Sequence, residues 1–289
     1  MTALTRLEDA VYGLYAAGAS AWARRRHRDD FARVERFCLF VGYPRSGHSL
    51  VGAMLNAHRD AVISHELNAH DLILAGCSRD ELYGHILARS SWFNLRGNTS
   101  NYEYQVPRQW QGRFAALRVI GEKRGGAVTR CITAHPDFLD RVRDLVRVPL
   151  RAIHVVRNPW DNIAAISIDN RLSLPDAVDF YFRHCATTGR LGVPCAPEEV
   201  VTVRHEDMIR DPSGVLAGLL AFLELDAEPA YLDDCCSIVF PRPTYTRRKR
   251  EWTPALLAEV ERNVRDYPFL DGYAWEIPQE AGATPPPGP

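Results

Sequence analysis

The sequence predicts an α/β protein of three layers, in which helices cover both faces of a doubly wound, parallel central sheet. Short, continuous apolar runs alternate along the chain with segments of helical periodicity. Such runs suit strands that are buried on both faces, as in parallel sheets. The 289 residues, 46% hydrophobic and 25% charged, form an ordinary globular composition with enough length for a sizeable core.

The strands and helices of this fold are predicted in alternation. We expect five strands, at residues 37–41, 61–64, 117–120, 153–156 and 200–203. Between them we expect amphipathic helices at residues 50–57, 136–145, 160–168 and 177–185. Strand–helix alternation is typical of a doubly wound sheet, and we expect one domain over residues 1–278.

The two ends of the chain depart from this alternation. An apolar stretch at residues 11–23 is followed by Arg24-Arg25-Arg26-His27-Arg28, which favours a helical extension over residues 1–30 that packs on the domain. An interfacial membrane helix and a cleaved targeting segment are the alternatives, but a secretory signal carries its charge before the apolar run. The Pro-rich tail, residues 279–289, is predicted to be disordered.

Overall charge and cysteine usage exclude several classes of function. Lys and Arg total 35 against 36 Asp and Glu, so no global electrostatic attraction to nucleic acid is expected. A bound anion therefore needs a local site. The seven cysteines are odd in number and contain no CxxC pair, which indicates neither a disulfide framework nor a zinc site. We expect a reducing, cytoplasmic location.

The most informative segment, Gly42-Tyr43-Pro44-Arg45-Ser46-Gly47-His48-Ser49-Leu50, follows the first predicted strand and precedes a helix. Its pattern is GxxxxGHS, whereas a nucleoside-triphosphate loop has lysine where His48 stands. The backbone N–H groups of the turn and helix start are predicted to cradle a phosphate; they belong to Ser46, Gly47, His48, Ser49 and Leu50. The cation of the loop is Arg45, which stands before the second glycine. We expect its guanidinium to lie near a group that is attached to the bound phosphate.

Four segments together resemble a known family. The loop PRSGHSL is similar to the 5′-phosphosulfate loop of sulfotransferases that use 3′-phosphoadenosine 5′-phosphosulfate (PAPS). The runs VVRNPWD at 155–161 and VRHEDMI at 203–209 resemble two further family motifs, and Trp252 leads to Gly272-Tyr273 as in the family's last segment. The resemblance covers residues 37–273. It implies PAPS as co-substrate, adenosine 3′,5′-bisphosphate as product, and no metal ion.

The resemblance also implies contacts for the rest of the nucleotide. In the family, an arginine and a serine eight residues later hold the 3′-phosphate; here Arg157 matches, but the serine position is Ala165. Ser167 and Arg171 are four residues apart and would share one helix face. We therefore predict a shifted register that uses Ser167 and Arg171, with Asn162 as the alternative. His205 replaces the family's adenine-contacting tyrosine.

The general base is predicted by resemblance to the tyrosylprotein branch of the family. The histidine that small-molecule sulfotransferases use is missing from residues 121–126. In the tyrosylprotein branch, the catalytic glutamate lies 21 residues beyond the loop arginine, which is the spacing between Arg45 and Glu66. Glu66 is then the base, Arg45 the sulfuryl-binding cation, and Lys123 the group that stabilises the transition state. His65 is an alternative base.

Three features remain open at this stage. Glu122 is either an ion-pair partner of Lys123 or a further candidate base. The basic run at residues 247–250 is either a solvated loop, a loop over the 3′-phosphate, or a contact for a polyanion or membrane. The aromatic-rich segment at residues 90–112 is expected to line the pocket of an unidentified small-molecule, sugar, lipid or peptide acceptor; its aromatic residues are Trp92, Phe93, Tyr102, Tyr104 and Trp110.

Two other functions compete with sulfuryl transfer. One is a P-loop kinase or NTPase, against which the histidine at the Walker lysine position argues. The other is a non-catalytic protein that keeps a nucleotide pocket for interaction.

Overall fold

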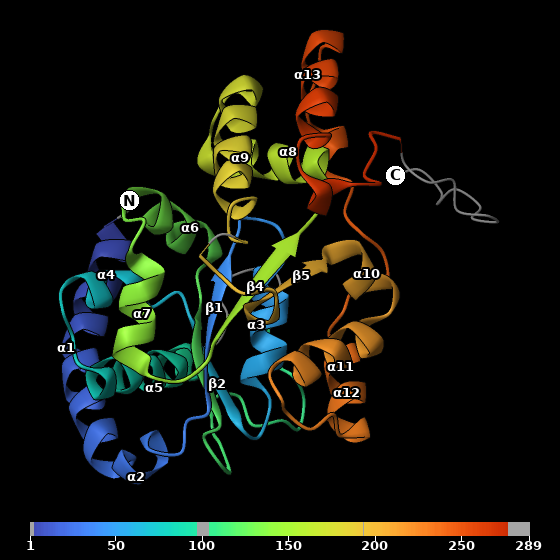
Figure 1. Cartoon of the computed structure of the whole chain (residues 1–289). Helices are drawn as coiled ribbons and strands as arrows, with labels where there is room; N and C mark the ends of the chain where they lie inside the picture. Colours follow the sequence, from blue (N-terminus) through green and yellow to red (C-terminus); the bar gives the residue numbers. More distant parts are fainter. Residues whose placement is uncertain (1–2, 97–103, 193, 277–289) are drawn as a thin grey trace.

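The computed structural model describes residues 3–96, 104–192 and 194–276. Its centre is a five-stranded, fully parallel sheet with the strand order β2-β3-β1-β4-β5 (Figure 1). The strands are β1 (Arg36–Val41), β2 (Ala61–His65), β3 (Val119–Lys123), β4 (Leu150–Val156) and β5 (Val200–Arg204). The predicted α/β fold is confirmed, and the tail at residues 279–289 lies outside the described residues.

The buried side chains of β1 alternate between two hydrophobic clusters. Phe37 and Leu39 belong to the cluster on one face of the sheet, whereas Cys38 and Phe40 belong to the cluster on the other. Alternation of this kind is the strand geometry itself, in which successive side chains point to opposite faces. The run is continuously apolar because both faces are covered.

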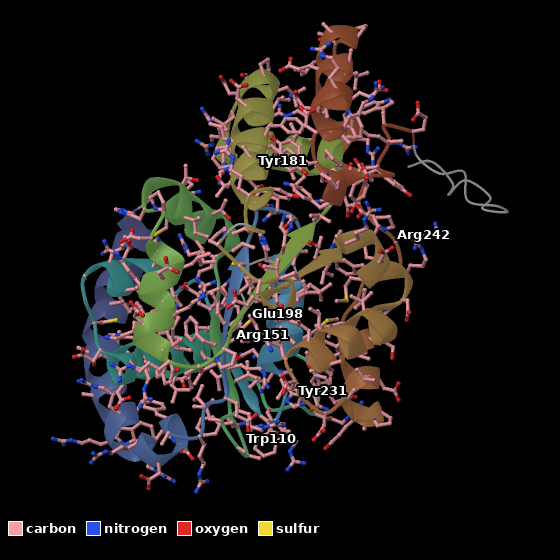
Figure 2. All side chains as sticks on the ribbon, viewed as in Figure 1. Trp110, Arg151, Tyr181, Glu198, Tyr231 and Arg242 are labelled. Atoms are coloured by element: carbon pink, nitrogen blue, oxygen red, sulfur yellow. The ribbon has the colours of Figure 1, made fainter. Side chains whose placement is uncertain are left out.

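Helices cover the two faces and the carboxyl edge of the sheet. The first face is covered by α1 (Ala3–Arg26), α2 (Arg28–Phe31), α4 (Ala69–Leu74), α5 (Arg79–Arg96), α6 (Gly125–Ala134) and α7 (Phe138–Val146). The second face is covered by α3 (His48–Asn56), α10 (His205–Arg210), α11 (Pro212–Phe222) and α12 (Pro229–Cys236). Tyr231 of α12, labelled in Figure 2, donates its hydroxyl proton to the Met54 carbonyl of α3 at 2.8 Å.

A third cluster lies beyond the carboxyl ends of the strands. It is built from α8 (Pro159–Asn170), α9 (Leu174–Thr188) and α13 (Pro254–Val264), which rise above the sheet edge in Figure 1. Short 3₁₀ turns occur at Pro197–Glu199, Thr246–Lys249 and Pro268–Leu270.

Most predicted strand and helix boundaries differ from the observed ones by a few residues. The third strand begins at Val119, not at residue 117, and at its start the N–H groups of Arg118 and Val119 both donate to the Asp60 carbonyl. The part of the predicted excursion at residues 90–96 is the last stretch of α5. There Trp92 packs on the rings of Tyr12 and Tyr15 from α1. Among the described residues, no helix is long and apolar enough to cross a membrane.

The solvated-loop interpretation of residues 247–250 is wrong for Arg247, which is 3% exposed. Its guanidinium donates to the Asp161 carboxylate at 2.7 Å and to the carbonyls of Ala274 and Trp275 at 2.9 and 2.6 Å. The backbone N–H of Arg247 also donates to Asp161, at 2.8 Å. The first turn of α8, the basic turn and residues 274–275 are thereby fastened together.

Removing one partner of this buried pair leaves the other charge without compensation. We expect Asp161→Asn to lower the free energy of unfolding by about 3–5 kcal/mol, measured by urea denaturation. The matched control is Asp207→Asn, because Asp207 forms an exposed pair with Arg210 on α10. Its effect is expected to stay within about 0.5 kcal/mol. Equal losses for the two variants would contradict the structural role of the buried pair.

Candidate active site

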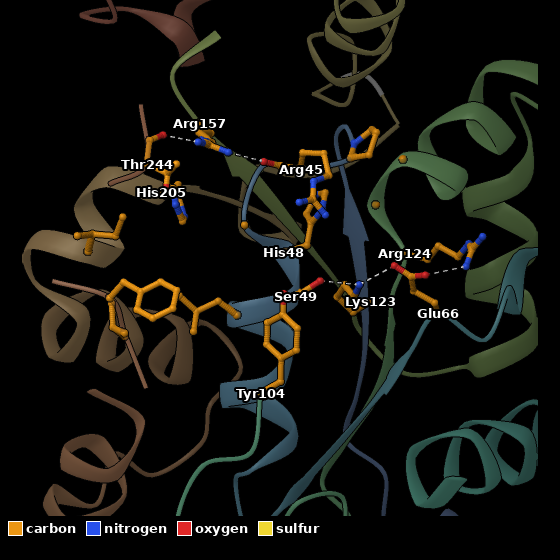
Figure 3. Close-up of a pocket in the computed structure, with 18 of the residues that line it drawn as sticks. Arg45, His48, Ser49, Glu66, Tyr104, Lys123, Arg124, Arg157, His205 and Thr244 are labelled. Carbon is orange, nitrogen blue, oxygen red and sulfur yellow. Dashed lines mark hydrogen bonds and ion pairs between the residues drawn. The ribbon is translucent and has the colours of Figure 1, made fainter. Parts of the chain in front are cut away.

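A cavity of about 420 Å³ opens at the carboxyl ends of the strands. One wall is the loop between β1 and α3, and a second is formed by the ends of β2 and β3 with the start of α6 (Figure 3). The third wall comes from β4, α10 and residues 239–244. In open parallel sheets, ligands bind at this edge, where the strand connections diverge to opposite faces.

The loop at residues 42–47 and the start of α3 border the cavity. Gly47, His48 and Ser49 line it, whereas Ser46, a predicted contact, is fully buried and does not. Gly47 has φ +106°, a left-handed conformation that ends the turn and lets α3 begin at His48. Within the described residues, the N–H groups of residues 46–49 donate to no protein acceptor, whereas the N–H of Leu50 donates to the Gly47 carbonyl at 3.1 Å. The prediction that Leu50 supplies a backbone donor is therefore wrong; Leu50 contributes its side chain to the lining.

His48 supports the loop from beneath. Its Nε2 lies 3.1 Å from the Ser46 hydroxyl, which in turn donates to the Tyr43 carbonyl at 3.2 Å. Burial, together with the nearby Lys123 ammonium, lowers the pKa of His48 to about 3, so the imidazole is neutral. A Cβ atom on Gly125 would lie 2.6 Å from Nε2 of His48. His48, at the position of the Walker lysine, is thus uncharged and supports the conformation of the loop through Ser46.

Lys123 is the centre of a three-residue cluster. In the parallel register, Lys123 of β3 pairs with His65 of β2, so Glu66 follows directly beside it. The Lys123 ammonium, 4% exposed, lies 2.9 Å from Oε1 of Glu66 and 3.0 Å from the Ser49 hydroxyl. A Cβ on Gly52 would lie 2.8 Å from the Lys123 side chain. Because Gly52 has no side chain, the Lys123 side chain can pack directly against α3.

The charges of this cluster perturb one another. Burial alone would raise the pKa of the Glu66 carboxyl, but Lys123 and Arg124 outweigh it and lower that pKa to about 2. Arg124 donates to Oε2 of Glu66 at 3.3 Å. Burial lowers the pKa of the Lys123 ammonium, and Glu66 opposes this shift. At neutral pH, the carboxylate is ionised and held by two cations.

The two competing candidates for the base lie elsewhere. Glu122 points to the opposite face of β3 from Lys123, where its carboxylate accepts the N–H groups of Asn68 and Ala69 at 2.6 and 2.7 Å. It is fully buried, burial raises its pKa to about 7, and it forms no ion pair with Lys123 in the described structure. Glu122 therefore accepts hydrogen bonds from the N-terminus of α4 and does not line the cavity.

His65 stacks on Phe93 with ring centroids 4.2 Å apart. Burial lowers the pKa of its imidazole to about 3, with a further contribution from Lys123. His65 lines a small separate pocket behind Lys123, not the main cavity. Because its ring faces that small pocket, His65 is not placed to take a proton from a group bound in the main cavity beside Glu66.

Arg157 and His205 form the far side of the cavity. The Arg157 guanidinium donates to the Thr244 carbonyl at 2.6 Å, to the Thr246 hydroxyl at 3.0 Å and to the Arg45 carbonyl at 3.3 Å. His205 begins α10 and packs against Gly47, on which a Cβ would lie 2.5 Å from its Nδ1. Burial lowers the pKa of His205 to about 3, with help from Arg157. The ring is therefore neutral.

The shared helix face predicted for Ser167 and Arg171 is wrong. Helix α8 ends at Asn170, and Arg171 takes a left-handed conformation with φ +55°. The buried Ser167 hydroxyl donates to the Leu172 carbonyl at 2.7 Å, and neither residue lines the cavity. The alternative, Asn162, is also buried and donates to the Pro44 carbonyl at 2.8 Å, which holds the loop.

Arg45 lies at the mouth of the cavity in a left-handed backbone conformation, with φ +67°. Its side chain is 56% exposed, and Nε lies 2.7 Å from a carboxylate oxygen of Asp169, near the end of α8. The predicted sulfuryl-binding cation is thus at the cavity, but it is paired with a carboxylate.

The predicted aromatic segment contributes one described residue to the cavity, and several other lining residues were not predicted from the sequence. Of the aromatic residues singled out at residues 90–112, Tyr104 lines the cavity; Trp92, Phe93 and Trp110 do not, and Tyr102 lies outside the described residues. Arg124, Arg130, Arg242 and Thr244 also line it.

Comparison with known proteins agrees with this geometry. The profile of the Sulfotransferase family matches residues 39–229. Among solved structures, the chain is similar to the sulfotransferase domain of the olefin synthase from Synechococcus PCC 7002, with 16% identity, a TM-score of 0.55, and coverage of 85% of this chain and 97% of that one.

Two further structures are more distant. Sulfotransferase STF9 from Mycobacterium avium has 14% identity and a TM-score of 0.49 over 91% of this chain and 84% of its own. A sulfotransferase from Alicyclobacillus acidocaldarius has 18% identity and a TM-score of 0.47 over 81% and 93%. None of the curated protein sequences matches this chain.

The family profile covers about two thirds of the chain and contains the phosphate loop, Glu66, Lys123, Arg157 and His205. The chain belongs to the sulfotransferase family.

Proposed function

We propose that the protein transfers a sulfuryl group from PAPS to a hydroxyl or amine of an acceptor. One observation carries this proposal: the Lys123 ammonium, the Ser49 hydroxyl and the Glu66 carboxylate meet beside the free N–H groups of the loop. A bound anion, a cation for its developing charge and a proton acceptor are the three requirements of sulfuryl transfer.

The chemistry of the lining fits the donor nucleotide. The loop N–H groups suit the 5′-phosphosulfate, and Arg157 with the segment at residues 244–246 suits the 3′-phosphate. The apolar side chains of Leu50, Ile209, Val239 and Phe240 also line the cavity, which suits a purine ring. The neutral His205 imidazole at the same wall adds a stacking surface.

The donor supplies an activated sulfuryl group: the bond between sulfur and the 5′-phosphate oxygen breaks, a bond between sulfur and the acceptor oxygen or nitrogen forms, and adenosine 3′,5′-bisphosphate leaves. Glu66 accepts the proton that the acceptor loses. Lys123 and Arg45 neutralise charge on the transferring group and on the leaving oxygen. This division of work follows the positioning and electrostatic logic of phosphoryl transfer.

Lys123 is positioned to couple donor binding to proton transfer from the acceptor to Glu66. In the structure its ammonium is shared between Ser49 and Glu66, which makes Glu66 a weak base. We propose that Lys123 turns toward the phosphosulfate oxygens when the donor binds. The ion pair between Lys123 and Glu66 then weakens, and the pKa of the Glu66 carboxyl rises. Proton transfer to Glu66 is therefore favoured only when the donor is bound.

Adenosine 3′,5′-bisphosphate is expected to raise the melting temperature more than ATP or ADP, because the site has an anion contact at each end and no lysine at the Walker position. A ligand at 100 times its Kd adds about 2.7 kcal/mol of stability. Differential scanning fluorimetry measures this. Equal or greater stabilisation by ATP with Mg²⁺ would instead favour a kinase or NTPase.

Arg157→Ala is expected to weaken binding of adenosine 3′,5′-bisphosphate by about one to two orders of magnitude, since a charge-assisted hydrogen bond contributes roughly 1.5–3 kcal/mol. Adenosine 5′-phosphosulfate lacks the 3′-phosphate, so its affinity is expected to change little. Isothermal titration calorimetry compares the two ligands. Equal losses for both would mean that Arg157 acts on the loop, through the Arg45 carbonyl, and not on the 3′-phosphate.

Glu66→Gln is expected to lower kcat by about 10²–10⁴-fold, because the near-isosteric amide cannot accept a proton. Binding of adenosine 3′,5′-bisphosphate is expected to be nearly unchanged. Transfer of labelled sulfate from PAPS over an acceptor panel is the assay, with His65→Ala as the control variant. Full activity of Glu66→Gln together with loss of activity in His65→Ala would assign the base to the histidine. Nucleotide binding without turnover of any acceptor would favour a non-catalytic role.

A further inference from the structure

The wall of the cavity on the Glu66 side is cationic. Arg124 precedes α6 and Arg130 lies in its middle, and both line the cavity together with the small residues Gly125 and Gly126. The Arg130 guanidinium folds back along the helix, since its NH1 lies 3.8 Å from the position that a Cβ would take on Gly126. The positive end of the α6 dipole adds to the potential of this wall.

Arg130 differs from most arginines of the chain. It is exposed, and the described structure gives it no ion pair or hydrogen bond, whereas arginines such as Arg118, Arg143 and Arg247 are bonded to carboxylates. Within the described residues, Glu66 is the only acidic side chain that lines the cavity. Arg124 and Lys123 already bond Glu66. The wall therefore carries positive charge that no described residue neutralises.

The donor does not account for this charge. The proposed contacts to its two anionic groups lie on the loop and on the opposite wall, at Arg157 and Thr244. Figure 3 shows Arg157, His205 and Thr244 on one side of Ser49, with Arg124 and Glu66 on the other. An acceptor whose hydroxyl reaches Glu66 lies against Arg124, because the guanidinium is 3.3 Å from the same carboxylate.

We infer that the acceptor is an anionic hydroxyl compound, whose carboxylate or phosphate group binds Arg130 and Arg124 while its hydroxyl faces Glu66. A planar guanidinium suits the oxygen pair of either anion. The inference rests on the proposed sulfuryl transfer and names the acceptor class for that same site.

The test compares matched acceptors that differ in one charge. The probes are 4-hydroxyphenylacetate and 3-hydroxybutanoate, each against its methyl ester, and glycerol 3-phosphate against glycerol. Sulfate transfer from labelled PAPS is measured for each. For the wild type, we expect kcat/KM to favour the anionic member of a pair by about ten- to a hundredfold. Arg130→Gln is expected to bring that ratio close to one, mainly through KM.

The matched control is Arg262→Gln, an exposed arginine on α13 with no ion pair in the described structure, which is expected to keep the ratio. If no probe is turned over, binding of each pair to the complex with adenosine 3′,5′-bisphosphate is measured by calorimetry. A preference for the anion that Arg130→Gln removes supports the inference. No preference, no binding of any probe, or a preference that Arg130→Gln retains overturns it.

Failure of the acceptor inference is distinguishable from failure of sulfuryl transfer. If the wild type sulfates neutral and anionic probes equally, the proposed reaction stands and the acceptor class is wrong. If adenosine 3′,5′-bisphosphate does not bind at all, the proposed reaction itself fails, and the inference fails with it.

Discussion

The parallel register between β2 and β3 is the constraint on which the rest of the site depends. Pairing His65 with Lys123 brings Glu66, the next residue, within 2.9 Å of the ammonium. A slip of one residue would turn Lys123 to the opposite face of the sheet, where Glu122 now lies. Because all five strands are parallel, the loop, Lys123, Arg157 and His205 also meet at the same edge. The chemistry of the site thus follows from strand direction.

Two buried cations with opposite functions lie near this edge. Arg247 is held by a carboxylate and two carbonyls, and it fastens α8 to the end of the described chain. Lys123 is held by one carboxylate and one hydroxyl, and burial lowers its pKa. Breaking a buried ion pair is costly when nothing replaces the lost partner. In the proposed function, Lys123 exchanges its partners when an anionic donor binds, whereas the partners of Arg247 stay in place.

Space around the functional side chains is supplied by glycines. Gly47 makes room for His205, Gly52 for Lys123, and Gly125 for His48. Each of these approaches is closer than any Cβ atom would permit, and each joins elements distant in sequence. These glycines therefore let His205, Lys123 and His48 pack closely around the loop between β1 and α3.

What the sequence by itself determined was local in origin: five strands from apolar runs, and a glycine-rich loop from its glycines and the helix that follows. It also predicted Arg45, Glu66, Lys123 and Arg157 as site residues by resemblance to family motifs, and the structure brings these four residues to one cavity. The family assignment followed from these motifs. The exact ends of strands and helices were predicted less well, and the fourth strand, for example, begins at Leu150 and not at residue 153.

Only the tertiary structure decided the directions and partners of the side chains. It turned Glu122 away from Lys123, ended α8 before Arg171, buried Arg247 against Asp161 and placed Arg130 on the cavity wall. These outcomes depend on contacts between residues far apart in the chain. A hydrogen bond or ion pair of that kind leaves no periodic signal in the sequence, since either partner alone is compatible with a solvated surface position.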